Sequence, residues 1–343
     1  MKRKLMALLL AGALAVGLTA CSRNVGAEDS APPASSPTGG TTETTGAKDP
    51  SEVKVALVCG GAVNDGGWNA SAYEGLQRIE ETLGVETAYT EKVAVAEMPQ
   101  VIRTYARQGF DLIFGHGAEF GEPMSTVAPE FPDTTFVAVN ANVEAGNLTG
   151  TVFKFGECGY FCGMAAAMVS ETGKIGIIPP DDAPNNKADI DTYELGAKAV
   201  NPDIEVYTAF TGSWDDLPKA KEASESLISK GCDVLLAMGD AYAVGVYQAC
   251  ENAGIKAIGW VSDQHDLSDA VICSGLQSVG DVYVATAERY LEGTMEQGVQ
   301  VYGMPDGAQG MSEFYGLTEE QAAEVEAAMQ DYLDGKLEIP TLY

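Results

Sequence analysis

Short apolar runs alternate with amphipathic stretches from about residue 53 onward. The runs are rich in Val, Ile and Leu, which is typical of strands buried on both faces. Between the first two runs, Tyr73, Leu76, Ile79 and Leu83 recur at spacings of three and four, as in an amphipathic helix over 69–83. The predicted strands are 53–60, 85–89, 111–115, 134–140, 148–155, 174–179, 204–210, 233–239, 256–261 and 270–276.

The strand and helix alternation occurs twice, once before about residue 155 and once after it. Strands that alternate with helices form parallel sheets covered by helices on both faces. The pattern therefore predicts an α/β protein with two similar lobes. In an open parallel sheet the ligand crevice lies beyond the carboxyl ends of the strands.

The first 52 residues differ in composition from the rest. Three basic residues at positions 2–4 precede an apolar run of about 16 residues, shorter than the roughly 20 of a membrane-spanning helix. This is typical of an export signal, and LTAC at 18–21 resembles the bacterial lipobox, so we predict a signal peptide over 1–20 and lipidation of Cys21. Residues 22–52 contain no Leu, Ile, Met or aromatic residue, and 21–52 are predicted to be a disordered tether.

The net charge of −30 restricts the partners. Nucleic-acid binding needs clustered Lys and Arg, which do not occur, so no nucleic-acid partner is predicted. Membrane contact is expected through the lipid anchor only. The six cysteines beyond Cys21 are interpreted as small buried hydrophobes, with disulfides still open for an exported protein. Only two histidines, His116 and His265, are present, and neither a metal nor a cofactor is predicted.

Polar and aromatic residues follow several of the predicted strands, where the crevice is expected. Two indoles could stack on a flat heterocycle, while carboxylates and amides could accept hydrogen bonds from hydroxyls or ring amines. The candidates are Asn64, Asp65, Trp68 and Asn69 after 53–60, His116, Glu119, Phe120 and Glu122 after 111–115, Ser213, Trp214 and Asp215 after 204–210, Asp240 after 233–239, and Ser262, Asp263 and Gln264 after 256–261.

Structural roles stay open for most of these residues. Trp68 and Trp214 could be core aromatics, and the Asp residues could cap helices. Trp260 is interpreted as core and Glu119 as solvent-exposed. His116 is expected to face the crevice as a neutral hydrogen-bonding ring. The acidic stretch 181–191 lacks the glycine and terminal Glu of a calcium loop, and is interpreted as a polar loop that caps a helix from about residue 189.

Five segments resemble those of one known family, the basic membrane protein, or purine nucleoside receptor-like, group of ABC-transporter substrate-binding lipoproteins. They are VALVCGGAVNDGGWNASAYEGL, DLIFGHGAEFGEPM, TGSWDDLPKAKEAS, DVLLAMGDAYAVGVYQACENAGIKAIGWVSDQ and DGKLEIP. The resemblance implies a type I periplasmic-binding-protein fold, in which two Rossmann-like lobes joined by a hinge close over the ligand. Lobe 1 is expected over 53–155 plus about 276–305, lobe 2 over 156–275, and a C-terminal segment packing on the lobes over 306–343.

The resemblance also implies roles for particular residues. In nucleoside-binding members, an Asp and an Asn of the first loop and the Asp of Ser-Asp-Gln hold the ribose, while two aromatics sandwich the base. These roles would fall on Asp65, Asn69, Asp263, Trp68 and Trp214. Glu122 is the nearest match to the acidic residue that reads the base edge. The family's lysine in Thr-Ser-x-x-Lys is Gln277 here, and this departure keeps a free nucleobase open as the ligand.

The implied function is that of a monomeric, cofactor-free lipoprotein on the outer face of the bacterial cytoplasmic membrane. It would capture a purine nucleoside and deliver it to an ABC permease and its ATPase. A free base, another small ligand, or a role as a ligand-sensing receptor are the alternatives. An enzyme is not predicted, because no G-x-S-x-G, GK[ST] or metal constellation occurs. The carboxylates alone would not exclude a nucleosidase.

Overall fold

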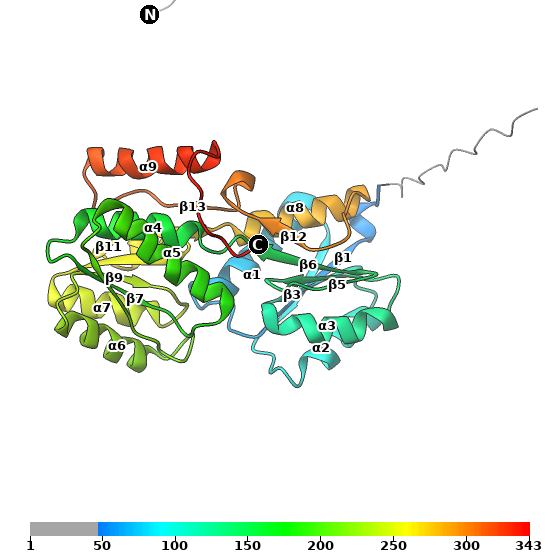
Figure 1. Cartoon of the computed structure of the whole chain (residues 1–343). Coiled ribbons are helices and arrows are strands. Elements are labelled where there is room, and N and C mark those ends of the chain that lie inside the picture. Colours follow the sequence, from blue (N-terminus) through cyan, green and yellow to red (C-terminus); the bar gives the residue numbers. More distant parts are fainter. Residues whose placement is uncertain (1–46) are drawn as a thin grey trace, which may run out of the picture. The chain divides into compact units, whose positions relative to one another are not determined.

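The apolar runs form two sheets within residues 47–343, the part of the chain that the computed structural model describes (Figure 1). The predicted signal peptide, Cys21 and most of the predicted tether lie outside the described residues. Each sheet and the helices around it are called a lobe below. The prediction of an α/β fold with mostly parallel sheets is confirmed.

Lobe 1 is built on a sheet of order β12-β6-β4-β3-β1-β2, paired in parallel throughout, with β5 added antiparallel to β6. Alternate residues of β1 face opposite sides. Val55 and Leu57 pack with α1 and α8, whereas Ala56 and Val58 pack with α2 and α3. The strands are β1 Lys54–Cys59, β2 Glu86–Thr90, β3 Leu112–His116, β4 Thr135–Val139, β5 Glu144–Ala145, β6 Leu148–Phe153 and β12 Gln300–Tyr302, and the helices are α1 Trp68–Leu83, α2 Met98–Arg107, α3 Gly121–Val127 and α8 Val279–Glu292.

Lobe 2 repeats this arrangement with the order β13-β11-β10-β9-β7-β8, in which only β13 is antiparallel to its neighbour. In β9, Val234 and Leu236 face α4 and α5, and Leu235 and Ala237 face α6 and α7. The strands are β7 Lys174–Ile178, β8 Glu205–Thr208, β9 Val234–Ala237, β10 Lys256–Val261, β11 Val271–Gln277 and β13 Gln309–Met311, and the helices are α4 Glu157–Val169, α5 Pro184–Val200, α6 Leu217–Ser229, α7 Ala243–Ala253 and α9 Glu319–Leu333.

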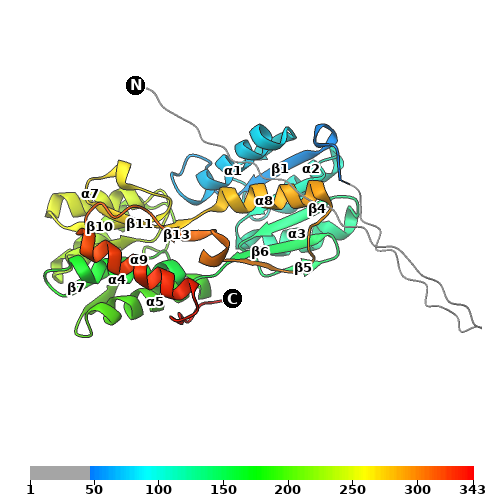
Figure 2. The same ribbon diagram turned by 90° about the horizontal axis from the view of Figure 1, so that it is seen from above.

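The chain passes between the lobes from β6 to α4, from β11 to α8, and from β12 to β13. Figure 2 shows α8 beside α1 on lobe 1, after the second of these crossings. Glu157, which is fully buried at the start of α4, ties the first crossing to the third. Its Oε2 accepts hydrogen bonds from the backbone N of Met304 (2.7 Å) and from Nε2 of Gln309 (2.8 Å), and its Oε1 accepts one from the hydroxyl of Tyr332 in α9 (2.5 Å). Burial raises the pKa of Glu157.

Both ends of the described chain are attached to the lobes. At the C-terminus α9 packs on α4, and the backbone N of Leu342 donates to the carbonyl of Phe155 (2.9 Å). Near the N-terminus the backbone N of Lys48 donates to the carbonyl of Leu291 (2.7 Å), and Pro50–Glu52 form a 3₁₀ turn. This turn departs from the disordered tether predicted up to residue 52, because Lys48 is bonded to lobe 1 and residues 49–53 are joined by local backbone hydrogen bonds.

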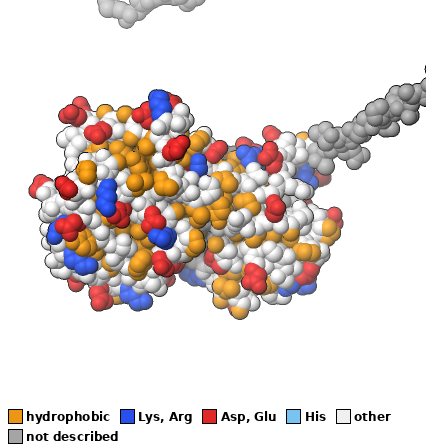
Figure 3. Space-filling view, viewed as in Figure 1, with side chains coloured by type: hydrophobic (Ala, Val, Ile, Leu, Met, Phe, Trp, Pro, Cys, Tyr) orange, Lys and Arg blue, Asp and Glu red, His pale blue; other side chains and the backbone are white. Residues whose placement is uncertain are grey.

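The surface of the two lobes is mixed in charge. In Figure 3 the acidic side chains lie scattered over both lobes with basic side chains between them, and the basic ones do not gather into one patch on this face. None of the helices in residues 47–343 is both long enough and apolar enough to span a membrane.

Candidate functional site

A cavity of about 700 Å³ lies between the carboxyl ends of the strands of the two lobes. This volume is within the range of small-molecule sites, roughly 300–1,000 Å³. The polar and aromatic side chains of its wall come from both lobes. They are Asn64, Asp65, Trp68, Asn69, Glu119 and Asn140 from lobe 1, Phe155 from the crossing between β6 and α4, and Asp181, Asn185, Asn186, Asp189, Ser213, Trp214, Asp215, Asp240, Trp260 and Gln277 from lobe 2.

Asp65 organises the loop that follows β1. Its Oδ1 accepts from the backbone N of Gly67 (3.0 Å) and of Ala70 (2.9 Å), and its Oδ2 accepts from the backbone N (3.0 Å) and Nδ2 (2.8 Å) of Asn69. Oδ1 of Asn69 in turn accepts from the backbone N of Gly61 (3.3 Å). The cap role that the sequence left open for Asp65 is therefore realised, and the loop holds the start of α1 at the cavity wall.

Trp68, the first residue of α1, rests on a buried support. Its indole stacks on the ring of His116 with centroids 4.2 Å apart and an interplanar angle of 23°. Nε2 of His116 lies 2.9 Å from the carbonyl of Trp68, and Nδ1 lies 2.9 Å from the hydroxyl of Tyr283. Burial lowers the pKa of His116 to about 4, so the ring is neutral at pH 7. Since a carbonyl only accepts, Nε2 carries the proton and Nδ1 accepts from Tyr283.

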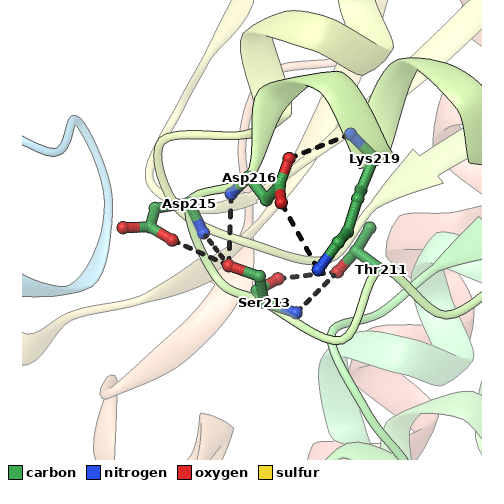
Figure 4. A network of polar contacts seen from close by, with 5 residues as sticks. All are labelled: Thr211, Ser213, Asp215, Asp216 and Lys219. Atoms are coloured by element: carbon green, nitrogen blue, oxygen red, sulfur yellow. Dashed lines mark hydrogen bonds and ion pairs between the residues drawn. The ribbon is translucent and has the colours of Figure 1, made fainter.

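Trp214 belongs to a short loop before α6, in which Thr211, Ser213, Asp215 and Asp216 form a network of hydrogen bonds (Figure 4). The hydroxyl of Thr211 donates to the carbonyl of Ser213 (2.6 Å), and the hydroxyl of Ser213 donates to Oδ1 of Asp215 (2.7 Å). Asp216 caps α6 by accepting from the backbone N of Lys219 (3.1 Å). These bonds hold the backbone before and after Trp214, and Trp214 itself is 41% exposed. The indole is therefore available to a ligand.

Asp240 lies where the two lobes touch. Its Oδ1 accepts from the backbone N of Trp68 (3.3 Å) in the other lobe. The approach requires the glycine before Trp68, since a Cβ on Gly67 would lie 3.0 Å from the same oxygen. Burial, with the nearby charges of Asp65 and Asp215, raises the pKa of Asp240 to about 7.

Six of the candidates named from the sequence do not line the cavity, which are His116, Phe120, Glu122, Ser262, Asp263 and Gln264. His116 lies behind Trp68 with 1% of its surface exposed. Glu122 is exposed at the start of α3. Asp263 is exposed as well, and its Oδ2 accepts from the hydroxyl of Tyr315 (2.6 Å). The chain turns after β10 because Val261 has a φ of +70°, and it is Gln264 instead that is buried, with its Nε2 lying 3.5 Å from the carbonyl of Gly66 in lobe 1.

Several residues of the cavity wall were not predicted from the sequence. The stretch interpreted as a loop up to about residue 189 is helical from Pro184, as proline at the first helical position favours. This places Asn186 and Asp189, three residues apart and both buried, on one side of α5 at the cavity. Glu119 also lines the cavity, and its side chain is exposed, as interpreted from the sequence; partial desolvation raises its pKa.

The wall is acidic. It contains six carboxylates and, among the described residues, neither Lys nor Arg. The carboxylates are Asp65, Glu119, Asp181, Asp189, Asp215 and Asp240. No group of three His, Cys, Asp or Glu residues within 47–343 is arranged to hold a metal ion. A wall of this kind favours ligands rich in hydrogen-bond donors and repels anions.

The six cysteines of the described chain are free and buried, as interpreted from the sequence. Burial raises the pKa of each thiol, most strongly for Cys158 and Cys162 in α4. They stay protonated at neutral pH and act as core residues.

Two parallel-sheet lobes, three crossings and a polar cavity between the strand ends define a two-lobed solute-binding protein. A solute-binding protein of an ABC transporter system from Conexibacter woesei has this fold, with a TM-score of 0.72 and 28% identity over 84% of this chain and 98% of its own. The chain belongs to the family described as ABC transporter substrate-binding protein PnrA-like, whose model matches residues 52–342. The resemblance predicted from the sequence motifs is thereby confirmed.

Relatives in this family carry different names. A purine-binding protein of Brucella abortus is 30% identical over 78% of this chain and 77% of its own length. The ABC transporter nucleoside-binding protein of Lactococcus lactis is 28% identical over 87% and 92%. The transcriptional activator protein med of Bacillus subtilis is 35% identical over 78% and 84%. Membership therefore shows a family of ABC transporter substrate-binding proteins, in which relatives carry different functions, and it does not specify the ligand.

Proposed function

We propose that the protein captures a purine nucleoside between its lobes and delivers it to an ABC permease and ATPase. One observation carries the proposal: each lobe contributes an indole, Trp68 or Trp214, to a single acidic cavity. Aromatic faces bind purine rings with about 1–3 kcal/mol per stacked base, and the surrounding oxygens accept from ribose hydroxyls. The purine-binding and nucleoside-binding relatives support the same ligand class.

The negative charge of the wall restricts the range of possible ligands further. Six carboxylates without a lining Lys or Arg would repel a phosphate. Gln277, which occupies the position of the family's lysine, is neutral and 7% exposed on the cavity wall. We therefore expect nucleosides to bind and their 5′-monophosphates to be rejected, with free nucleobases as the nearest competitors.

Closure of the lobes completes the proposed site. The bond from the backbone N of Trp68 to Asp240 spans the lobes, so it would form only when they are together. The three crossings would act as the hinge. The closed protein is then the form that the permease recognises.

Calorimetric titration of the full chain tests the ligand. Inosine, adenosine and guanosine should bind, hypoxanthine and adenine more weakly, and the 5′-monophosphates not at all. Binding of a sugar or an amino acid with no response to any purine would refute the proposed ligand. The same samples assayed for released base check that inosine is bound and not cleaved.

The proposed location depends on Cys21, which would anchor the protein to the outer face of the cytoplasmic membrane. A Cys21→Ser variant should leave the membrane fraction and fail to incorporate labelled fatty acid, whereas Cys59→Ser, which alters a cysteine buried in lobe 1, should remain membrane-bound. Equal membrane attachment of both variants would contradict the anchor.

A regulatory role is the second candidate, favoured by the 35% identity to a transcriptional activator. The net charge of −30 argues against direct contact with DNA, so such a role would use the bound ligand as a signal. Uptake of labelled inosine in a deletion strain separates the two candidates. Loss of uptake supports transport, and unchanged uptake with altered transcript levels supports sensing.

A further inference from the structure

Two buried oxygen acceptors on the cavity wall have no hydrogen-bond partner, one in each lobe. They are Oδ1 of Asn140, directly after β4, and Oδ2 of Asp189, in α5. Buried polar atoms nearly always have a partner, because leaving one unpaired costs about 1–3 kcal/mol. Two such atoms of the same kind in one cavity indicate that a ligand supplies the missing donors.

Asp189 is the more constrained of the two. Only 1% of its surface is exposed, and its Oδ1 accepts from the backbone N of Gly156 (2.8 Å) and of Gly159 (3.3 Å). Gly156 lies in the crossing from β6 to α4 and has a φ of +109°. One oxygen of Asp189 therefore holds the backbone of the crossing, and the other has no partner in a residue that lines the cavity.

The packing of α4 on α5 prevents Asp189 from moving to find another partner. A Cβ on Gly159 would lie 2.3 Å from the carbonyl oxygen of Asp189, and one on Gly163 would lie 2.0 Å from that of Tyr193. On the facing helix, a Cβ on Gly196 would lie 1.9 Å from the carbonyl oxygen of Tyr160. The two backbones are in direct contact at these glycines, so the backbone of α5 cannot shift toward α4 at Asp189, and the bonds from Gly156 and Gly159 hold its carboxylate.

We propose that Asp189 is a ligand-binding residue whose Oδ2 accepts a hydrogen bond from an N–H or O–H of the bound nucleoside while its Oδ1 holds the hinge backbone. Asn140 supplies a second acceptor from lobe 1. The inference rests on the proposed function and adds a requirement for the ligand. The ligand must carry a hydrogen-bond donor next to Oδ2 of Asp189, so an analogue with an acceptor at that position should not bind. Burial, to which the charge of Glu157 adds, raises the pKa of Asp189 to about 7, so the binding experiments below are made at pH 8, where the carboxylate is ionised and Oδ2 is an acceptor.

Asp189→Asn tests this contact. The side-chain oxygen of Asn can still accept from Gly156 and Gly159, which fixes its orientation and points its NH₂ group at the ligand donor. Asp191→Asn, on the same helix but exposed and paired with Lys187, is the matched control. We expect the inosine dissociation constant to rise about 10-fold to 100-fold in Asp189→Asn, and to change by less than about 2-fold in Asp191→Asn.

Analogues of inosine identify the donor. Inosine and hypoxanthine are titrated into the wild type and both variants together with 1-methylinosine, 2′-deoxyinosine, 3′-deoxyinosine and 5′-deoxyinosine, which remove the N–H and O–H donors of inosine one at a time. The analogue that lacks the donor for Asp189 should bind the wild type weakly. Its affinity should fall little further in Asp189→Asn, because the hydrogen bond to Asp189 is already absent. Equal inosine affinity in Asp189→Asn and Asp191→Asn overturns the inference. So does a wild type that binds every analogue as tightly as inosine, a result that does not depend on the variant folding.

Failure of the proposed function would look different. If the wild type binds a hexose and no purine compound, the nucleoside proposal fails, and the same two variants titrated with that hexose still decide whether Asp189 contacts a ligand. Failure of the wild type to bind any of these donor-bearing compounds would overturn both.

Discussion

Replacing Asp189 by Asn should change how the free energy of unfolding depends on pH. Burial raises the pKa of Asp189 from 3.8 to about 7. The folded protein therefore keeps this proton up to about pH 7, whereas the unfolded chain releases it near pH 3.8. The stability that this proton contributes is fully present below pH 3.8 and is lost as the pH rises through 7.

The size of the effect follows from the two pKa values. At about 1.36 kcal/mol per pH unit, the full loss is roughly 4 kcal/mol, of which about 2 kcal/mol falls between pH 5 and pH 7. Asn cannot titrate and keeps the acceptor for Gly156 and Gly159. The unfolding free energy of Asp189→Asn minus that of the wild type should therefore increase by about 2 kcal/mol over this interval.

Urea unfolding of both proteins without ligand at pH 5, 6, 7 and 8 measures this difference. Groups that titrate in both proteins, such as Asp240, cancel when they do not interact with Asp189. Asp191→Asn, which removes an exposed carboxylate, should show a nearly constant difference from the wild type. A difference for Asp189→Asn that is equally flat would refute the reasoning.

Three further changes probe the site and the hinge. Trp214→Ala should weaken inosine binding by about 1–3 kcal/mol in calorimetry with little change in melting temperature, since the side chain is 41% exposed; unchanged affinity would remove Trp214 from the site. His116→Gln should reduce the loss of unfolding free energy between pH 7 and pH 5, measured by urea unfolding. The pKa of His116 is lowered from 6.5 to about 4, so the wild type loses stability as the pH falls from 6.5 toward 4. An equal loss in both proteins would contradict this. Glu157→Ala should lower the unfolding free energy in guanidinium by about 3–5 kcal/mol, because three buried donors lose their acceptor, and a loss below about 1 kcal/mol would show that the hinge does not depend on it.

The sequence predicted the two sheets well because its signal is local. Alternating strands and helices appear in the order of residues, and every predicted strand occurs in the structure within a few residues of its expected bounds. The wall residues that follow directly from strand ends were predicted on the same basis. Asn64, Asp65, Trp68, Asn69 and Asp240 all line the cavity, because the carboxyl ends of parallel strands meet at one edge.

The direction of a side chain past a strand end is not local, and there the prediction failed. His116 and Asp263 both follow buried strands, yet one lies behind Trp68 and the other is directed away by the backbone turn at Val261. Glu119, interpreted as solvent-exposed, is exposed in the structure and also lines the cavity. Where such a side chain lies depends on the residues that pack around it, and these come from other parts of the chain.

By itself the sequence determined the class of fold, the family and the acidic, aromatic character of the site, since these follow from periodicity and from motifs within single segments. Tertiary structure alone decided where Asp189 lies, from which we proposed its role. The close packing of α4 on α5 at glycines far apart in the sequence fixes this residue between the hinge and the cavity, and burial then leaves one of its oxygens without a partner. No pattern within 181–191 contains that information, because the contacts that create it come from another helix.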